Sequence, residues 1–322
     1  MASDTAVHDR ATRTSPHESS SRVGALLFVT ALVGLGLVTA PFAFQMFSRA
    51  PKGATMIADF KPFMTNQRLD GFQHDIAEID GAVTQIDRAR PPAAASNATY
   101  QEFDRQWPAI NADMTNLLDT VQRNVGNYRA VAALPDFRLF PWFFVVPGVL
   151  IAGAAGVALR RPRSRSRSRR RLRVVLVALG VGLVLAPLVF DMFARAPKGG
   201  HMMTAFKDLE TTQKVQRVQG YFSAMAAGQG AIRLDIEAAL QRSGTDLPAV
   251  AALDRDWVHI LNDMTPMIGA MSDNVGNYRA VAAMPPFPMF PWFFVIPGVL
   301  VAGSALLIRV PRNNATRRQG VS

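Results

Sequence analysis

A stretch of the chain that occurs twice constrains the fold more than any other feature. Residues 124–150 read NVGNYRAVAALPDFRLFPWFFVVPGVL, and residues 274–300 repeat them as NVGNYRAVAAMPPFPMFPWFFVIPGVL. Each copy leads from a polar segment through an aromatic and proline-rich patch into a long apolar run. The sequence therefore predicts two tandem units with the same architecture.

Four apolar runs are long enough to cross a bilayer as helices, and none has Asp, Glu, Lys or Arg in its interior. They cover residues 23–44, 141–159, 174–190 and 291–308. The first run is interpreted as an uncleaved anchor, because it is longer than the apolar core of a secretory signal. The sequence predicts an all-α membrane protein with four transmembrane helices, two in each unit.

The distribution of arginine predicts the orientation of these helices. Residues 160–173 carry nine arginines and no acidic residue, and residues 309–322 are also basic. Such segments stay on the cytoplasmic side of a membrane. We therefore expect cytoplasmic termini and a cytoplasmic linker, with residues 48–139 and 195–290 on the extracytoplasmic side of a bacterial inner (plasma) membrane.

The predicted organisation of the chain follows from these boundaries. The linker is interpreted as a topology anchor that contacts anionic headgroups; a contact with a specific partner, or one controlled by phosphorylation, is the alternative. No nucleic-acid partner is expected. In order, the segments are a disordered cytoplasmic tail (1–22), repeat 1 (23–159), an Arg- and Ser-rich linker (160–173), repeat 2 (174–308) and a cytoplasmic tail (309–322).

Each extracytoplasmic segment shows two helical seams. Mostly apolar residues recur at alternating intervals of three and four over residues 69–86 and 100–121, and again over residues 215–232 and 253–271. This spacing is typical of narrow helix–helix packing, so each segment is expected to form an antiparallel helical hairpin. Each unit has two membrane spans, so both units should have the same orientation in the membrane. Two such hairpins side by side predict a four-helix bundle with pseudo-two-fold symmetry.

Two features are expected to end or bend these helices. Gly126 and its counterpart Gly276 suit the left-handed residue that follows a helix. The sequence Arg-Ala-Pro-Lys-Gly at residues 49–53, repeated at residues 195–199, is predicted to form an elbow between span and hairpin.

Residues that are identical in both copies near the predicted membrane boundary are candidates for contact with lipid or a partner protein. Basic side chains there suit lipid phosphate, and a dedicated partner site is the alternative. The candidates are Tyr128, Arg129, Tyr278, Arg279, Arg49, Lys52, Arg195 and Lys198. Trp142 and Trp292 are predicted to anchor the chain at the membrane interface.

Small residues at intervals of four predict where membrane helices approach closely. In the first copy they are Gly148, Ala152 and Gly156, and in the second copy they are Gly298 and Ala302. We expect this face of each span to pack against another helix.

The sequence offers little for catalysis. It has no cysteine, so disulfides, thiol nucleophiles and thiolate metal sites are excluded. It has no helical His-Glu metal motif, phosphate loop or serine elbow. Asp104 and Asp113, with their counterparts Asp254 and Asp263, are expected to be solvated or salt-bridged, and acid–base catalysis is the alternative. Trp107 and Trp257 are expected to pack in a core, and contact with a ligand is the alternative. We expect a protein that is not an enzyme and that needs no cofactor or metal.

An Ala-Pro-Lys-Gly motif followed by Phe-Lys occurs in both units. Together with a bias toward Ala, Arg, Val and Asp, it resembles uncharacterised actinobacterial envelope membrane proteins. The resemblance covers both repeats. It implies an inner membrane that faces a complex cell envelope, and it implies no activity.

These observations predict a non-catalytic integral membrane protein that acts as a scaffold or accessory subunit of a larger cell-envelope complex, such as a lipid-transport or envelope-assembly machine. Its partners would be membrane lipids and other integral membrane or envelope proteins. One alternative is a sensory or ligand-binding module with an external helical bundle, although the cytoplasmic segments are too short for an output domain. Another is an envelope-lipid binder that uses the gap between the hairpins.

Overall fold

The computed structural model describes residues 16–160 and 166–308, and helices make up nearly all of these residues. No strand occurs among these residues, so the predicted all-α class is confirmed. Three segments lie outside the described residues: 1–15, 161–165 of the linker and the C-terminal tail 309–322. The prediction that the N-terminal tail is disordered therefore falls outside them for residues 1–15.

The chain divides into two compact units. One, the apolar unit, contains the described parts of Met1–Phe44, Pro141–Phe190 and Pro291–Ser322. The other, the bundle unit, contains Gln45–Phe140 and Asp191–Phe290. Each unit is therefore assembled from segments of both halves of the chain.

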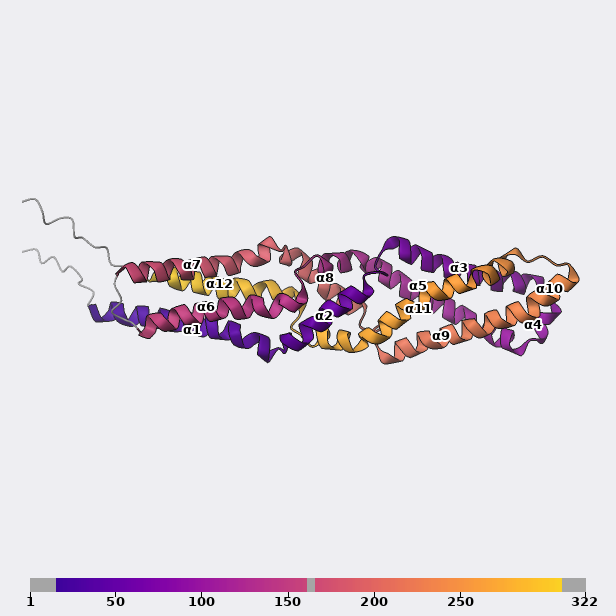
Figure 1. The fold of residues 1–322 in the computed structure, drawn as a ribbon, viewed down its shortest axis with the longest axis horizontal. Coiled ribbons are helices and arrows are strands. Elements are labelled where there is room, and N and C mark those ends of the chain that lie inside the picture. Colours follow the sequence, from indigo (N-terminus) through magenta and orange to yellow (C-terminus); the bar gives the residue numbers. More distant parts are fainter. Residues whose placement is uncertain (1–15, 161–165, 309–322) are drawn as a thin grey trace, which may run out of the picture. The chain divides into compact units, whose positions relative to one another are not determined.

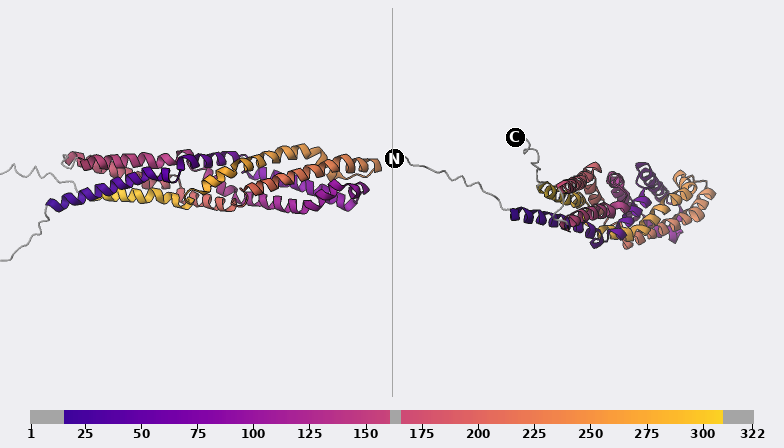
Figure 2. Two further views of the ribbon diagram at one scale, coloured as in Figure 1. Left: turned by 90° about the horizontal axis from the view of Figure 1, so that it is seen from below. Right: turned by 60° about the vertical axis from the view of Figure 1, so that its left-hand side comes forward.

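Four long helices form the apolar unit and lie alongside one another (Figures 1 and 2). Each contains a stretch long and apolar enough to cross a membrane, so the predicted number of such helices is confirmed for the described part of the chain. α1 already begins within the segment predicted to be a disordered tail. The helices are α1 (Pro16–Ala43), α6 (Phe140–Arg160), α7 (Ser166–Val189) and α12 (Phe290–Leu307).

Glycines bring pairs of these helices into close approach. A Cβ placed on Gly148 of α6 would lie 2.8 Å from the carbonyl oxygen of Gly34 in α1. A Cβ on Gly298 of α12 would likewise lie 2.7 Å from the carbonyl oxygen of Gly180 in α7. Only glycine permits backbones to approach this closely. The small-residue faces therefore lie where these helices meet.

The small-residue face is shorter than the interval of four suggests. Ala152 and Ala302 take part, since their backbone nitrogens would lie 2.6 Å from a Cβ on Gly34 and Gly180 respectively. Gly156, also expected on this face, has no atom within 4 Å of the position of a Cβ. The close approach is thus confined to about one helical turn of α6, and Gly156 does not contribute to it.

The bundle unit is built from long helices joined by short ones. In the first half they are α2 (Met46–Phe60), α3 (Asn66–Ala89), α4 (Pro92–Ser96), α5 (Ala98–Ala132) and the 3-10 turn η1 (Phe137–Leu139). In the second half they are α8 (Met192–Ala205), α9 (Thr212–Ala231), the π-helical η2 (Ile232–Glu237), α10 (Ala238–Ser243), α11 (Pro248–Ala282) and the 3-10 turn η3 (Phe287–Met289).

Local sequence sets where the long helices begin. The side chain of Thr65 accepts a hydrogen bond from the backbone N–H of Arg68, and Thr211 accepts one from that of Lys214. Asn97 caps α5 by accepting from the backbone N–H of Tyr100. Such caps satisfy N–H groups that have no partner within the helix.

One hydrophobic core joins α3, α5, α9 and α11. Leu69 and Phe72 of α3 are fully buried in it, as are Leu118 of α5 and Leu253 of α11. The predicted seams supply most of this core. α3 packs against α11 as well as against α5, and α9 packs against α5 as well as against α11 (Figure 1). Helices from the two halves of the chain therefore interleave.

The expected helix ends at Gly126 and Gly276 are wrong. α5 continues to Ala132 and α11 to Ala282. A glycine within a helix costs only about 1 kcal/mol. In α5 the buried face continues beyond Gly126 through Tyr128 and Val131, and burying two such side chains outweighs that cost.

The expected elbow at residues 49–53 is also displaced. α2 begins at Met46 and includes Pro51, so the proline removes one helical hydrogen bond without ending the helix. The break lies at Gln45, whose φ is 53°. Its counterpart Asp191 has the same left-handed φ of 53°, so both halves turn at the same place.

Candidate functional site

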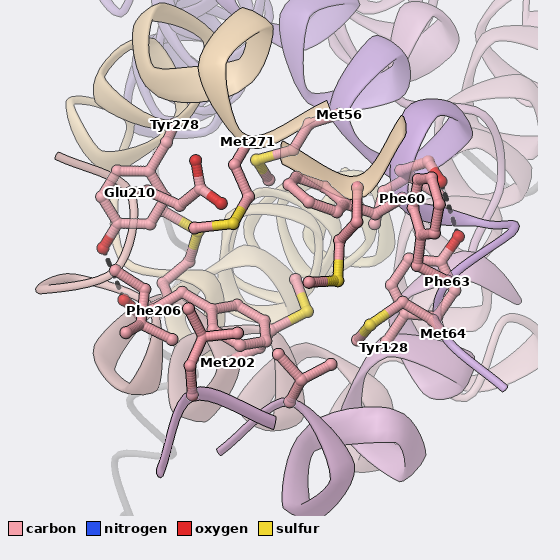
Figure 3. A pocket seen from close by; sticks show the side chains of 16 residues that line it. Met56, Phe60, Phe63, Met64, Tyr128, Met202, Phe206, Glu210, Met271 and Tyr278 are labelled. Carbon is pink, nitrogen blue, oxygen red and sulfur yellow. Dashed lines mark hydrogen bonds between the residues drawn. The ribbon is translucent and has the colours of Figure 1, made fainter. Parts of the chain in front are cut away.

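A cavity lies inside the bundle unit, among α2, α5, α8 and α11 and the two segments that follow α2 and α8 (Figure 3). Its volume is about 50 Å³. It is lined by Met56, Ile57, Phe60, Phe63, Met64, Leu117, Val121, Tyr128, Met202, Met203, Phe206, Leu209, Glu210, Met267, Met271 and Tyr278.

The two halves of the chain contribute equally to this lining. Each lining residue from the first half has its counterpart from the second half in the same wall. The counterpart lies 146 positions later for residues up to Met64 and 150 positions later from Leu117 onward. Met56 pairs with Met202, for example, and Tyr128 with Tyr278. The most different pair is Met64 with Glu210, which places one acidic group in a wall that is otherwise almost wholly apolar.

Two tyrosines line the cavity with their rings and use their hydroxyls elsewhere. Tyr128 donates to the carbonyl oxygen of Ile57, and Tyr278 donates to that of Met203, both at 2.5 Å (Figure 3). Burial raises the pKa of Tyr128 to about 12. Both side chains are buried, so they do not form the surface that the sequence suggested for a partner. They continue the buried seam and tie α5 to α2 and α11 to α8.

Glu210 is the polar group of the cavity. It is only 6% exposed, and its Oε2 has no hydrogen-bond partner among the described residues. Burial raises the pKa of its carboxyl from 4.5 to about 8. At neutral pH Glu210 is therefore mostly protonated, and it offers both a hydrogen-bond donor and an acceptor to the cavity.

Methionine dominates the wall. Six of the lining residues are methionines, namely Met56, Met64, Met202, Met203, Met267 and Met271. The cavity exceeds the roughly 10–15 Å³ that one water requires, but it is smaller than the roughly 300–1,000 Å³ of a typical small-molecule pocket. Unbranched thioether side chains can change rotamer readily. Rotamer changes of these methionines can therefore alter the shape of the cavity.

Two of the predicted contact arginines cap helices of the bundle unit. Arg49 of α2 donates to the carbonyl oxygen of Ala283 at 2.6 Å, and Arg195 of α8 donates to that of Ala133 at 2.7 Å. Ala283 and Ala133 are the C-caps of α11 and α5. Each arginine thus caps the long helix of the other half, where the helix dipole favours positive charge.

The remaining basic candidates lie on the surface of the bundle unit. Arg279 donates to the hydroxyl oxygen of Thr212 at 3.2 Å. Arg129, Lys52 and Lys198 are exposed. The structure therefore separates the eight candidates into two buried tyrosines, two capping arginines and four exposed basic residues.

Two matched ion pairs connect the halves. Arg68 of α3 contacts Asp263 of α11, and Lys214 of α9 contacts Asp113 of α5, both at 2.6 Å. Tyr221 also donates to Asp113 at 2.8 Å. Burial acts to raise the pKa of Asp113, but the hydrogen bonds from Lys214 and Tyr221 outweigh it and lower that pKa below its ordinary value.

The predicted interface tryptophans lie on the first turns of the apolar helices. Trp142 of α6 and Trp292 of α12 are each about half exposed. Trp107 and Trp257 are buried in the bundle core, and the indole N–H of Trp107 donates to Asp80 at 2.9 Å.

Among the described residues, no group of three or more His, Cys, Asp or Glu side chains is placed to hold a metal ion. No family model, curated protein or solved structure matches the chain.

The sequence did not single out Glu210. A signal was nevertheless present, because aligning the two halves places an acid opposite Met64 at a position between two helices. The second return helix is also rich in methionine. Neither feature reveals a cavity until the helices of both halves are brought together.

Proposed function

We propose that this chain is a non-catalytic integral membrane protein whose helical bundle binds an apolar, lipid-type ligand, as an accessory subunit of a cell-envelope complex that handles lipids. The observation that carries the proposal is the methionine-lined cavity, to which both halves contribute matching residues. An apolar cavity with few polar groups is the usual form of a binding site for apolar ligands.

The proposed topology places the four apolar helices across a bacterial inner membrane. Both termini and the Arg- and Ser-rich linker are cytoplasmic, and the bundle unit is extracytoplasmic. Support comes from the nine arginines of residues 160–173 and the basic residues after 308, because basic segments next to spans remain in the cytoplasm. This topology gives the bundle unit access to lipids of the envelope.

The proposed architecture is a tandem repeat of two helical hairpins related by a pseudo-two-fold axis. Residues that contact their own counterparts support it, since such contacts are expected near a two-fold axis. In the bundle unit the ring centroids of Phe137 and Phe287 are 6.1 Å apart. In the apolar unit those of Phe144 and Phe294 are 4.6 Å apart. The matched ion pairs between α3 and α11 and between α9 and α5 follow the same relation.

Photocrosslinking tests the binding function. The purified protein in detergent is incubated with hexadecanol that carries a diazirine near the end of its chain, irradiated, digested and mapped by mass spectrometry. We expect adducts on the cavity residues of α2, α5, α8 and α11, and competition by unlabelled hexadecanol. Adducts confined to α1, α6, α7 and α12 would contradict the proposal, since any membrane helix contacts such a probe.

A pair of variants sharpens this test. Val121→Phe adds volume at the cavity wall and should reduce the cavity adducts several-fold. Val258→Phe makes the same change at an exposed position of α11 outside the cavity and should leave them unchanged. Equal labelling of both variants would show that the adducts do not report the cavity.

A scaffold without a ligand is the second candidate function. The exposed lysines Lys52 and Lys198 occupy matching places in the two halves, as do the exposed arginines Arg129 and Arg279. They favour this function because basic side chains suit an acidic partner or lipid headgroups. Mild-detergent purification with chemical crosslinking should then recover a larger partner in fixed stoichiometry, even when the cavity is filled by Val121→Phe.

A further inference from the structure

The cavity is polar at one side and apolar at the other. Figure 3 shows Glu210 and Tyr278 on one side, and Met64 and Tyr128 on the opposite side. Because both tyrosine hydroxyls already donate to backbone carbonyls, the difference between the sides comes from Glu210 and Met64. A ligand that fills the cavity therefore contacts a polar wall at one end and an apolar wall at the other.

The polar side of the cavity contains a buried oxygen that lacks a hydrogen-bond partner. Oε2 of Glu210 is buried and accepts no hydrogen bond from the described residues. Leaving such a group unpaired costs free energy that a ligand with a hydrogen-bonding group recovers. Met64, at the matching position in the other half, makes no such demand, so the fold tolerates an apolar residue there.

The charges around the cavity argue for an uncharged group on the ligand. No lysine, arginine or histidine is among the lining residues, so an anionic headgroup would have no counter-charge. A cation would have to ionise Glu210 inside an apolar wall, and the desolvation of both charges opposes such a pair. A hydroxyl or carbonyl pairs with the protonated carboxyl at no such cost.

The walls argue for a flexible chain. The cavity holds only a few atoms as it stands, and methionines at both ends must move to enlarge it. A single hydrocarbon chain can follow the space that they vacate, whereas a rigid polycyclic ligand requires the whole volume at once.

We propose that the cavity binds a single-chain lipid through an uncharged hydroxyl or carbonyl group at Glu210, with the hydrocarbon chain directed toward Met64. This inference rests on the proposed binding function and adds the class of ligand and its orientation. A long-chain alcohol, a monoacylglycerol and a protonated fatty acid share this chemistry.

Competition experiments test the role of Glu210. Hexadecanol, hexadecane and hexadecylamine compete for cavity labelling by the diazirine-bearing hexadecanol in the full-length protein. We expect the wild type to prefer hexadecanol over hexadecane by about tenfold, as one net hydrogen bond predicts. Glu210→Met should bring that ratio close to one. Glu210→Gln, which retains an uncharged donor and acceptor, should keep most of it.

Controls separate this inference from the function on which it rests. Glu102→Met, an exposed glutamate of α5, should leave the ratio unchanged, and circular dichroism should show that all variants are folded. Cavity labelling with equal affinities for alcohol and hydrocarbon would overturn the role of Glu210 while the binding function stands. A preference for hexadecylamine would also overturn it. Absence of labelling in the bundle unit would overturn the binding function itself.

The position of the adducts tests the orientation. The diazirine lies near the far end of the chain, so we expect adducts on Phe63, Met64 and Tyr128. Adducts concentrated on Met271 and Tyr278 would place the chain end beside Glu210 and overturn the proposed direction.

Discussion

Glu210 and Met64 occupy the same position in the two halves of the chain, and they show how one side chain can change the chemistry of a cavity. Both line the cavity, and only Glu210 introduces a polar atom that is buried without a partner. Natural proteins keep such groups rarely. The carboxyl is therefore a feature to which both stability and ligand preference should respond.

Stability of the bundle should fall as the pH rises, because of Glu210. The folded protein keeps this carboxyl protonated up to a pKa of about 8, whereas its ordinary pKa is 4.5. Between these values the folded state binds the extra proton, so each unit of pH removes about 1.4 kcal/mol, and the whole effect is on the order of 5 kcal/mol. The pKa of the neighbouring Tyr278 is raised above its ordinary value of 10 by burial, so this hydroxyl stays uncharged in the same window.

Urea unfolding of the bundle helices, followed by circular dichroism between pH 5 and pH 8, measures this effect. Glu210→Met should abolish most of the slope and be the more stable protein at pH 8. A variant with the slope of the wild type would show that another group causes it. The ordinary sequence signals did not predict this behaviour, because a pKa depends on burial by residues distant in the chain.

At the scale of the helix, the spacing of apolar residues predicted more than the glycines did. The seams at residues 69–86 and 253–271 lie in the core as expected, because their period is that of a helix face. Gly126 did not end α5, because its preference for a helix end is worth about 1 kcal/mol and the following buried residues are worth more. A rule based on the glycine alone does not take into account the residues that are buried after it.

Gly126→Ala should therefore stabilise the protein by roughly 0.5–1 kcal/mol, since alanine loses less backbone entropy within a helix. No atom lies within 4 Å of the position of the added Cβ. Thermal unfolding measures the change. Gly228→Ala is the matched opposite case, because its Cβ would lie 2.3 Å from Cγ of Phe103, and it should destabilise by about 1–3 kcal/mol. If Gly126→Ala destabilised the protein, α5 would not be an ordinary helix at this position.

The small-residue face of α6 gives a second comparison at this scale. Gly148→Ala places a Cβ 2.8 Å from the carbonyl oxygen of Gly34, so α1 and α6 must separate and lose packing. Its melting temperature in detergent should fall by several degrees. Gly156→Ala, which meets no atom within 4 Å, should melt like the wild type. Equal effects of the two changes would mean that the close approach does not stabilise the pair.

At the scale of the whole molecule, the internal repeat predicted a bundle of helices, but it could not predict which helices meet. A seam indicates that a helix packs against another helix, but it does not identify which helix that is. In the structure α3 lies against α11 and α9 lies against α5, and the ion pairs Arg68–Asp263 and Lys214–Asp113 join these helices. The core of the bundle unit therefore depends on both halves of the chain being present.

The two halves should associate when they are expressed as separate chains divided within residues 161–165. Burial of the shared core provides the affinity, and affinity purification of one half should recover the other. Asp113→Lys sets two positive charges against each other beside Lys214 and should weaken the bundle by about 2–4 kcal/mol, so that recovery falls sharply.

Charge exchange makes this result specific. Lys214→Asp in the second half should restore recovery with Asp113→Lys in the first, because the reversed pair can form again across the same two helices. Glu102→Lys is the control, since its partner Arg105 lies on the same helix, and it should leave recovery unchanged. If the exchanged pair behaves no better than Asp113→Lys alone, the contact between α5 and α9 does not hold the halves together, and the bundle must be stabilised by pairing within each half.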